Sequence, residues 1–109
     1  MRGLSSSART LPVMFDRTEL DAILRVYGRL VMSGECKDYA IDGIADRAVF
    51  SIFRRASEFP LYRIEKVPAQ AKRQGAWSIL APGGAILKRG HELSNLLKFF
   101  DKRRFQVIE

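Results

Sequence analysis

Alternation of apolar and polar residues is clearest in the middle of the chain, over residues 48–67 (AVFSIFRRASEFPLYRIEKV). The first half carries β-branched or aromatic residues at both alternating sets of positions, which favours a strand. After Pro60 the sequence YRIEK alternates as in a strand with one buried face. Because proline cannot donate to a sheet, Pro60 should precede its strand. The pattern predicts two central strands, at residues 47–55 and 61–67.

A helical pattern precedes these strands, over residues 17–33. Asp16 and Glu19 have the spacing of a capping box, and Gly34 suits the left-handed residue that ends a helix. One apolar stripe recurs at helical spacing: Leu20, Ile23, Leu24, Tyr27 and Val31. Gly28 costs about 1 kcal/mol relative to alanine inside a helix, and we interpret it as a close approach to the sheet.

Three shorter strands are predicted around the central pair. Residues 37–41 have the alternation of an edge strand, which ends at the turn dipeptide Asp42-Gly43. Residues 68–74 break the pattern and predict a loop or a single helical turn. Residues 76–81 and 85–89 flank the sequence Pro-Gly-Gly, and glycine supplies the positive φ that a tight turn needs. This last pair therefore predicts a hairpin.

The C-terminal part of the chain predicts a second helix over residues 91–103. Basic residues near its end complement the helix dipole. Its apolar residues recur at helical spacing: Leu93, Leu96, Leu97 and Phe100. Residues 105–108 (FQVI) form an apolar tail, which should pack back on the domain or lie across a neighbouring subunit.

The order of these elements predicts an α+β fold. An N-terminal helix leads into a five-stranded, mostly antiparallel meander, and a C-terminal helix packs on one face of the sheet. Residues 1–14 include a serine-rich leader and are predicted to be a disordered N-terminal tail. The rest, residues 15–109, has the length of a single domain.

Positive charge is concentrated in the second half of the chain. The net charge is +7, and residues 61–109 hold ten Lys and Arg against four Asp and Glu. Six basic residues near the central strands are candidates for a contact surface: Arg54, Arg55, Arg63, Lys66, Lys72 and Arg73. Tyr62 and Trp77 would either stack bases on that surface or belong to the core, and alternation with Ile64 favours the core. Solubility alone is the other interpretation of the charge.

A second candidate site lies where the last helix is predicted to begin. Lys88, Arg89 and His91 surround Gly90, which would let an anion approach the backbone of a helix N-terminus. Glu92 could satisfy the same dipole from within the chain, so ordinary capping is the alternative.

Catalytic and metal-binding patterns are absent from the sequence. The chain has one cysteine, Cys36, and one histidine, His91, and neither completes a zinc site or a local nucleophile–base pair. It has no Walker A loop and no dinucleotide-binding fingerprint, so we predict no cofactor and no catalytic residue. A lone cysteine favours a reducing compartment, and no apolar run reaches the roughly 20 residues of a membrane helix. A cytoplasmic location without membrane contact follows.

Several stretches resemble a small alphaproteobacterial family described as a domain of unknown function. They extend over roughly residues 15–100: DYAID at 38–42, AVFS at 48–51, RRASE at 54–58, PLYRIEK at 60–66, RQGA at 73–76 and LKRGHEL at 87–93. In that family a tryptophan often stands at the position of Cys36, which disfavours a catalytic thiol. The resemblance implies no reaction, cofactor or partner.

Three classes of function remain, in decreasing order of preference. The first is a non-catalytic module that acts through protein contacts, with an unknown partner or as a homodimer closed by residues 105–108 or by an edge strand. The second is binding of RNA or DNA by the basic C-terminal half. The third, an enzyme that uses Cys36 or His91, is the least favoured.

Overall fold

The computed structural model describes residues 12–55 and 59–108, and it describes the side chains of the last helix only as far as Asp101. Along the chain, a helix is followed by five strands, with a short 3-10 turn after the third strand, and then by a second helix. The elements are α2 (Arg17–Met32), β1 (Asp38–Ile44), β2 (Arg47–Phe53), β3 (Tyr62–Lys66), η1 (Pro68–Gln70), β4 (Trp77–Leu80), β5 (Ile86–Gly90) and α3 (Leu93–Ile108).

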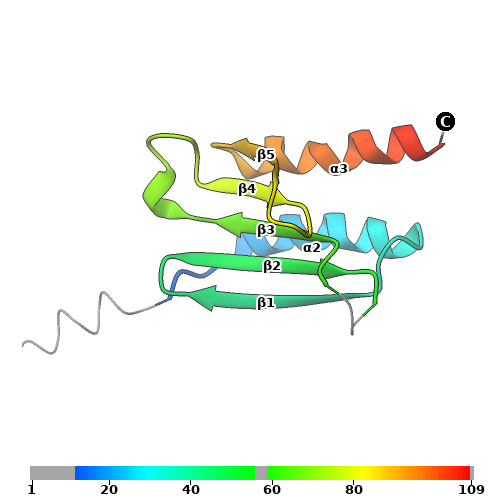
Figure 1. Cartoon of the computed structure of the whole chain (residues 1–109), viewed down its shortest axis with the longest axis horizontal. Coiled ribbons are helices and arrows are strands. Elements are labelled where there is room, and N and C mark those ends of the chain that lie inside the picture. Colours follow the sequence, from blue (N-terminus) through cyan, green and yellow to red (C-terminus); the bar gives the residue numbers. More distant parts are fainter. Residues whose placement is uncertain (1–11, 56–58, 109) are drawn as a thin grey trace, which may run out of the picture.

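The predicted sheet topology is confirmed. All four neighbouring pairs are antiparallel, and the strands lie in the order β1-β2-β3-β4-β5. Both helices lie on the same face of the sheet, where α3 contacts β4 and β5 (Figure 1). They run side by side in the same direction, and they contact each other. The domain therefore has two layers, one of helices and one of sheet.

The core lies between these two layers. Its members alternate along the strands and recur every three or four residues along the helices, as a face buried on one side requires. They are Ile23, Val26, Leu30, Cys36, Phe50, Ile52, Tyr62, Ile64, Trp77, Ile79, Leu96, Leu97 and Phe100. Full burial of one such large apolar side chain contributes roughly 1.5–3 kcal/mol, so this cluster holds the helices on the sheet.

The capping box of α2 is confirmed. The Glu19 amide donates to Asp16 Oδ1 over 2.8 Å, and the Asp16 amide donates to Glu19 Oε1 over 2.9 Å. At the other end, Gly34 has the predicted positive φ, +84°. The interpretation of Gly28 was wrong, because an added Cβ there would meet no atom within 4 Å. A close contact with the sheet is therefore not the reason for a glycine at position 28.

The predicted apolar stripe of α2 is confirmed except at Val31, because Leu20, Leu24 and Tyr27 pack against the core. Ile23 is buried as expected, but Val31 is 39% exposed, whereas Val26 and Leu30 are buried. The helix must cover the sheet and also contact α3, and Val26 faces the space shared with Leu97 of that helix. Packing against α3 thus extends the buried side of α2 to Val26, away from Val31.

The predicted end of β1 was also wrong. Asp42 and Gly43 form no turn, and the strand continues to Ile44 before a two-residue connection to β2. Gly43 is required for another reason: a Cβ there would lie 2.6 Å from Met14 Sδ and 2.9 Å from Val13 O. The segment before α2 crosses the end of β1 at this point, and the Val13 amide donates to Ile44 O over 3.3 Å.

The C-terminal elements follow the prediction with shifted limits. The hairpin between β4 and β5 is confirmed, with φ of +94° at Gly84. The last helix begins at Leu93, so His91 and Glu92 precede it. Residues 105–108, predicted to be an apolar tail, continue α3 to Ile108, and their side chains lie outside the described part of the chain. The predicted leader falls mostly on residues 1–11, which lie outside the described residues.

Candidate functional site

The predicted anion site coincides with a cavity between β5 and the start of α3. The cavity has a volume of about 330 Å³. Its walls are formed by Lys88, Arg89, Gly90, His91, Glu92, Asn95 and Leu96. The structure thus brings all four predicted residues to one place, at the junction of an edge strand and a helix.

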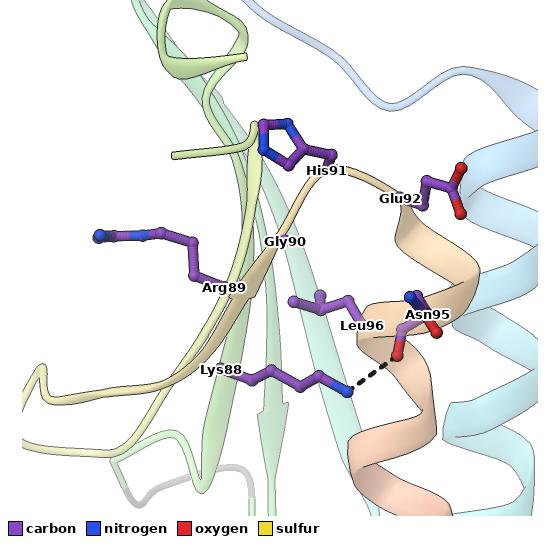
Figure 2. A pocket seen from close by; sticks show the side chains of 7 residues that line it. All are labelled: Lys88, Arg89, Gly90, His91, Glu92, Asn95 and Leu96. Atoms are coloured by element: carbon purple, nitrogen blue, oxygen red, sulfur yellow. Dashed lines mark hydrogen bonds between the residues drawn. The ribbon is translucent and has the colours of Figure 1, made fainter. Parts of the chain in front are cut away.

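The positive groups of this cavity point in different directions (Figure 2). Lys88 extends toward α3, where its Nζ donates to Asn95 O over 3.0 Å. Arg89 points to the other side of β5 and donates to the Gln74 side chain. His91 Nδ1 lies 3.1 Å from Ala71 O. The three side chains are thus held by internal polar contacts with different segments, and they do not converge on one point.

The six residues of the predicted basic surface are distributed over several parts of the molecule. Arg54 and Arg55 follow β2, and Lys72 and Arg73 follow η1; all four are exposed. Arg63 lies in β3 on the face opposite to Tyr62, because neighbouring strand residues point to opposite faces. The structure therefore places two exposed pairs in connections and only Arg63 on a sheet face away from the helices.

Lys66 belongs to the helix-covered side of the sheet. It alternates with Tyr62 and Ile64, which are core residues, so it points toward the helices. Its Nζ donates to Glu19 Oε1 over 2.6 Å and to Met14 O over 2.9 Å. Tyr62 and Trp77 are buried, as alternation favoured. Lys66 therefore joins the sheet to the start of α2.

The second face of the sheet is covered by neither helix (Figure 1). The strand register sets its residues in transverse rows, and paired residues share a face. One row across all five strands is Asp42, Val49, Glu65, Ser78 and Arg89, and the next is Ala40, Ser51, Arg63, Leu80 and Ile86. The pair Leu80–Ile86 follows a shift in register after the pair Ile79–Lys88, so Ile86 does not simply alternate with Lys88. With the flanking pairs Ile44–Arg47 and Asp38–Phe53, we name these residues the outer face.

The outer face is apolar for a surface that no helix covers. Six of its fourteen residues are apolar: Ala40, Ile44, Val49, Phe53, Leu80 and Ile86. Ile44 is 52% exposed and Ile86 is 48% exposed. The sequence signal for this face was the presence of large apolar residues at both alternating sets of positions in β2, but alternation alone did not show which of its two faces the helices cover.

One ion pair lies within the outer face. Arg47 donates to Glu65 Oε1 over 2.7 Å, and Glu65 is buried whereas Arg47 is half exposed. The same guanidinium donates to exposed Asp46, and this hydrogen bond holds the pKa of the Asp46 carboxyl below its usual value. Arg47 thus neutralises a carboxylate that the fold would otherwise bury alone.

Cys36 and His91 lie at opposite edges of the sheet. Cys36 precedes β1 and is buried in the core, and burial, with a smaller effect of Glu35, raises the pKa of its thiol to about 11. His91 follows β5 and is exposed. In the part of the chain that the structure describes, no group of three or more His, Cys, Asp or Glu residues could hold a metal ion. Neither described helix is long and apolar enough to cross a membrane.

Together, the two layers and the outer face define the class of the protein: a small α+β domain with an antiparallel meander covered on one side. The chain belongs to a protein family of unknown function, DUF2794, whose pattern matches residues 13–97. The resemblance to a domain of unknown function is thereby confirmed. No curated protein and no solved structure matches the chain.

Proposed function

We propose that the protein is a non-catalytic interaction module that makes protein contacts through its outer face. One observation carries this proposal: β2 has large apolar residues on both faces, Phe50 and Ile52 on one and Val49 and Phe53 on the other, and among the described residues helices cover only the first. An antiparallel sheet whose second face meets water normally alternates apolar and polar residues. Ile44 and Ile86 are exposed at opposite edges of this face, and partly exposed Phe53 and Leu80 lie between them. Apolar side chains left exposed across one face are typical of a contact surface.

The burial and protonation of the Cys36 thiol support the proposal that the module is non-catalytic. A reactive cysteine needs an accessible thiolate, whereas this thiol is buried and its raised pKa keeps it protonated near neutral pH. A cytoplasmic location belongs to the same proposal, because a single cysteine cannot form a disulfide within the chain.

The test compares two variants that each lose two exposed apolar side chains. Ile44→Ser with Ile86→Ser changes the outer face, and Val31→Ser with Met32→Ser changes the end of α2 in the helix layer. Each tagged protein is used to capture partners from a native cell extract, with and without nuclease. Sedimentation of the purified proteins reports self-association, in which the partner is a second copy.

We expect a partner, or a dimer mass, that survives nuclease and the α2 variant and is lost in the outer-face variant. Far-ultraviolet circular dichroism shows that both variants remain folded. Capture that vanishes with nuclease would instead support nucleic-acid binding. An outer-face variant that keeps every contact of the wild type would overturn the proposal.

A further inference from the structure

A cationic groove lies between the two helices, in the other layer of the domain from the outer face. Its volume is about 260 Å³. Four residues of α2 and four of α3 line it: Ala22, Arg25, Val26, Arg29, Ser94, Leu97, Lys98 and Asp101. In each helix these residues are spaced three or four apart, so each helix presents one continuous stripe to the groove.

Along the parallel helices, each of the two stripes contains one small and one buried apolar residue. Small Ala22 and Ser94 contribute at the N-terminal ends, and Val26 and Leu97 are buried and apolar. The small side chains leave room for another backbone to approach. The apolar side chains lower the local dielectric, which strengthens any charge interaction made above them.

The charges of the groove are incompletely neutralised. Arg29 donates to Asp101 Oδ1 over 3.2 Å at the C-terminal end of the stripes. Arg25 and Lys98, one on each helix, are exposed and form no ion pair or hydrogen bond with any residue in the described part of the chain. Three cations and one carboxylate therefore face the same space, with two of the cations available to a ligand.

We propose that this groove binds an acidic peptide segment of a partner protein, with an Asp or Glu carboxylate held between Arg25 and Lys98. The charge of the groove complements a carboxylate, and its small residues admit the peptide backbone. Nucleic acid fits less well, because no lining residue is aromatic and can stack a base. This site is distinct from the outer face and does not depend on it.

The experiment titrates the full chain with fluorescent decaglutamate at low salt and measures anisotropy, with an oligothymidine of equal length as the competing probe. The groove variant is Arg25→Gln with Lys98→Gln. The matched control is Lys72→Gln with Arg73→Gln, which removes the same charge from an exposed connection. Amide chemical shifts of the wild type locate the bound peptide.

We expect the groove variant to weaken decaglutamate binding about tenfold, since two charge-assisted contacts are lost, and the control to weaken it less than about twofold. Amide shifts should concentrate at residues 22–29 and 94–101. Equal losses in both variants would show attraction by net charge alone and overturn the site. So would shifts elsewhere, undetectable binding, or an oligothymidine that binds more tightly than decaglutamate and is displaced from the same amides.

Discussion

At the scale of single residues, the neighbours of a buried polar side chain decide whether it carries a charge. Glu65 and Cys36 are both buried, but Arg47 neutralises Glu65 whereas no cation contacts the Cys36 thiol among the described residues. The sequence placed Glu65 on the polar side of its strand. It could not show its partner, which lies 18 residues away and is brought there by the register of β2 and β3.

The raised pKa of Cys36 predicts a loss of stability at alkaline pH. Burial raises the pKa of the thiol from 9.0 to about 11, so the folded state keeps a proton that the unfolded state loses between these values. The free energy of unfolding should therefore fall as pH rises through that window, and it should be independent of this thiol below pH 9. Urea denaturation at several pH values measures the effect.

Cys36→Ala is the control for this prediction. Tyr27, whose pKa burial also raises, acts in the same direction, so only the difference between the two proteins reports the thiol. The variant is less stable throughout because it leaves a cavity, but its loss above pH 9 should be shallower. Parallel pH profiles for both proteins would contradict the assignment.

At the scale of helices and strands, the sequence predicted a feature correctly when the residues that produce it are close together in the chain. The capping box of α2 and the turn at Gly84 depend on residues a few positions apart, and both were predicted correctly. The end of β1 depends on Met14, far along the chain from Gly43, and was missed. The burial of Val26 in α2 likewise depends on a helix at the other end of the sequence.

Alanine substitution at three glycines separates the stability cost of backbone strain from that of steric overlap. Gly28→Ala should stabilise the protein by about 1 kcal/mol, because the helix gains propensity and the Cβ meets nothing. Gly84→Ala, at φ of +94° in open space, should cost about 1–2 kcal/mol from strain. Gly75→Ala should cost about 3 kcal/mol or more, since its φ is +97° and the Cβ would overlap Gly90 O.

Thermal unfolding followed by circular dichroism ranks these variants. The order of midpoints should be Gly28→Ala above the wild type, then Gly84→Ala, then Gly75→Ala. A Gly75→Ala midpoint equal to that of Gly84→Ala would show that the connection before β4 moves away from Gly90 without cost.

At the scale of the whole molecule, contacts between distant segments decide which surfaces are available. The α+β class, the meander and the single buried face followed from periodicity. The four residues of the predicted anion site do line one cavity, but the groove between the helices was not predicted. A net charge does not say which cations are already paired: Lys66 is held by Glu19, while Arg25 and Lys98 have no such partner among the described residues. The groove between α2 and α3 was missed because its shape depends on how the two helices pack against each other.

Lys66 is expected to contribute to the stability of the whole domain. Its ammonium contacts Glu19 and Met14 O in a largely shielded position, with 18% and 21% exposure for the two charged side chains. Lys66→Gln should lower the free energy of unfolding by about 1–2 kcal/mol, measured by urea denaturation. Asp101→Asn removes the more exposed pair with Arg29 and should change it by less than about 0.5 kcal/mol. Equal effects would show that shielding is unimportant here.

The segment that crosses the end of β1 also bears on how copies of this protein meet. An exposed sheet edge is a template for pairing with another chain, and natural proteins obstruct it with proline, charge or a covering segment. Here Pro12–Met14 lie against Gly43, the Val13 amide occupies Ile44 O, and Asp38 and Asp42 place negative charge along the rest of the strand. Two β1 edges would bring these carboxylates together, so the protein resists growing into a continuous sheet or a fibril from this side.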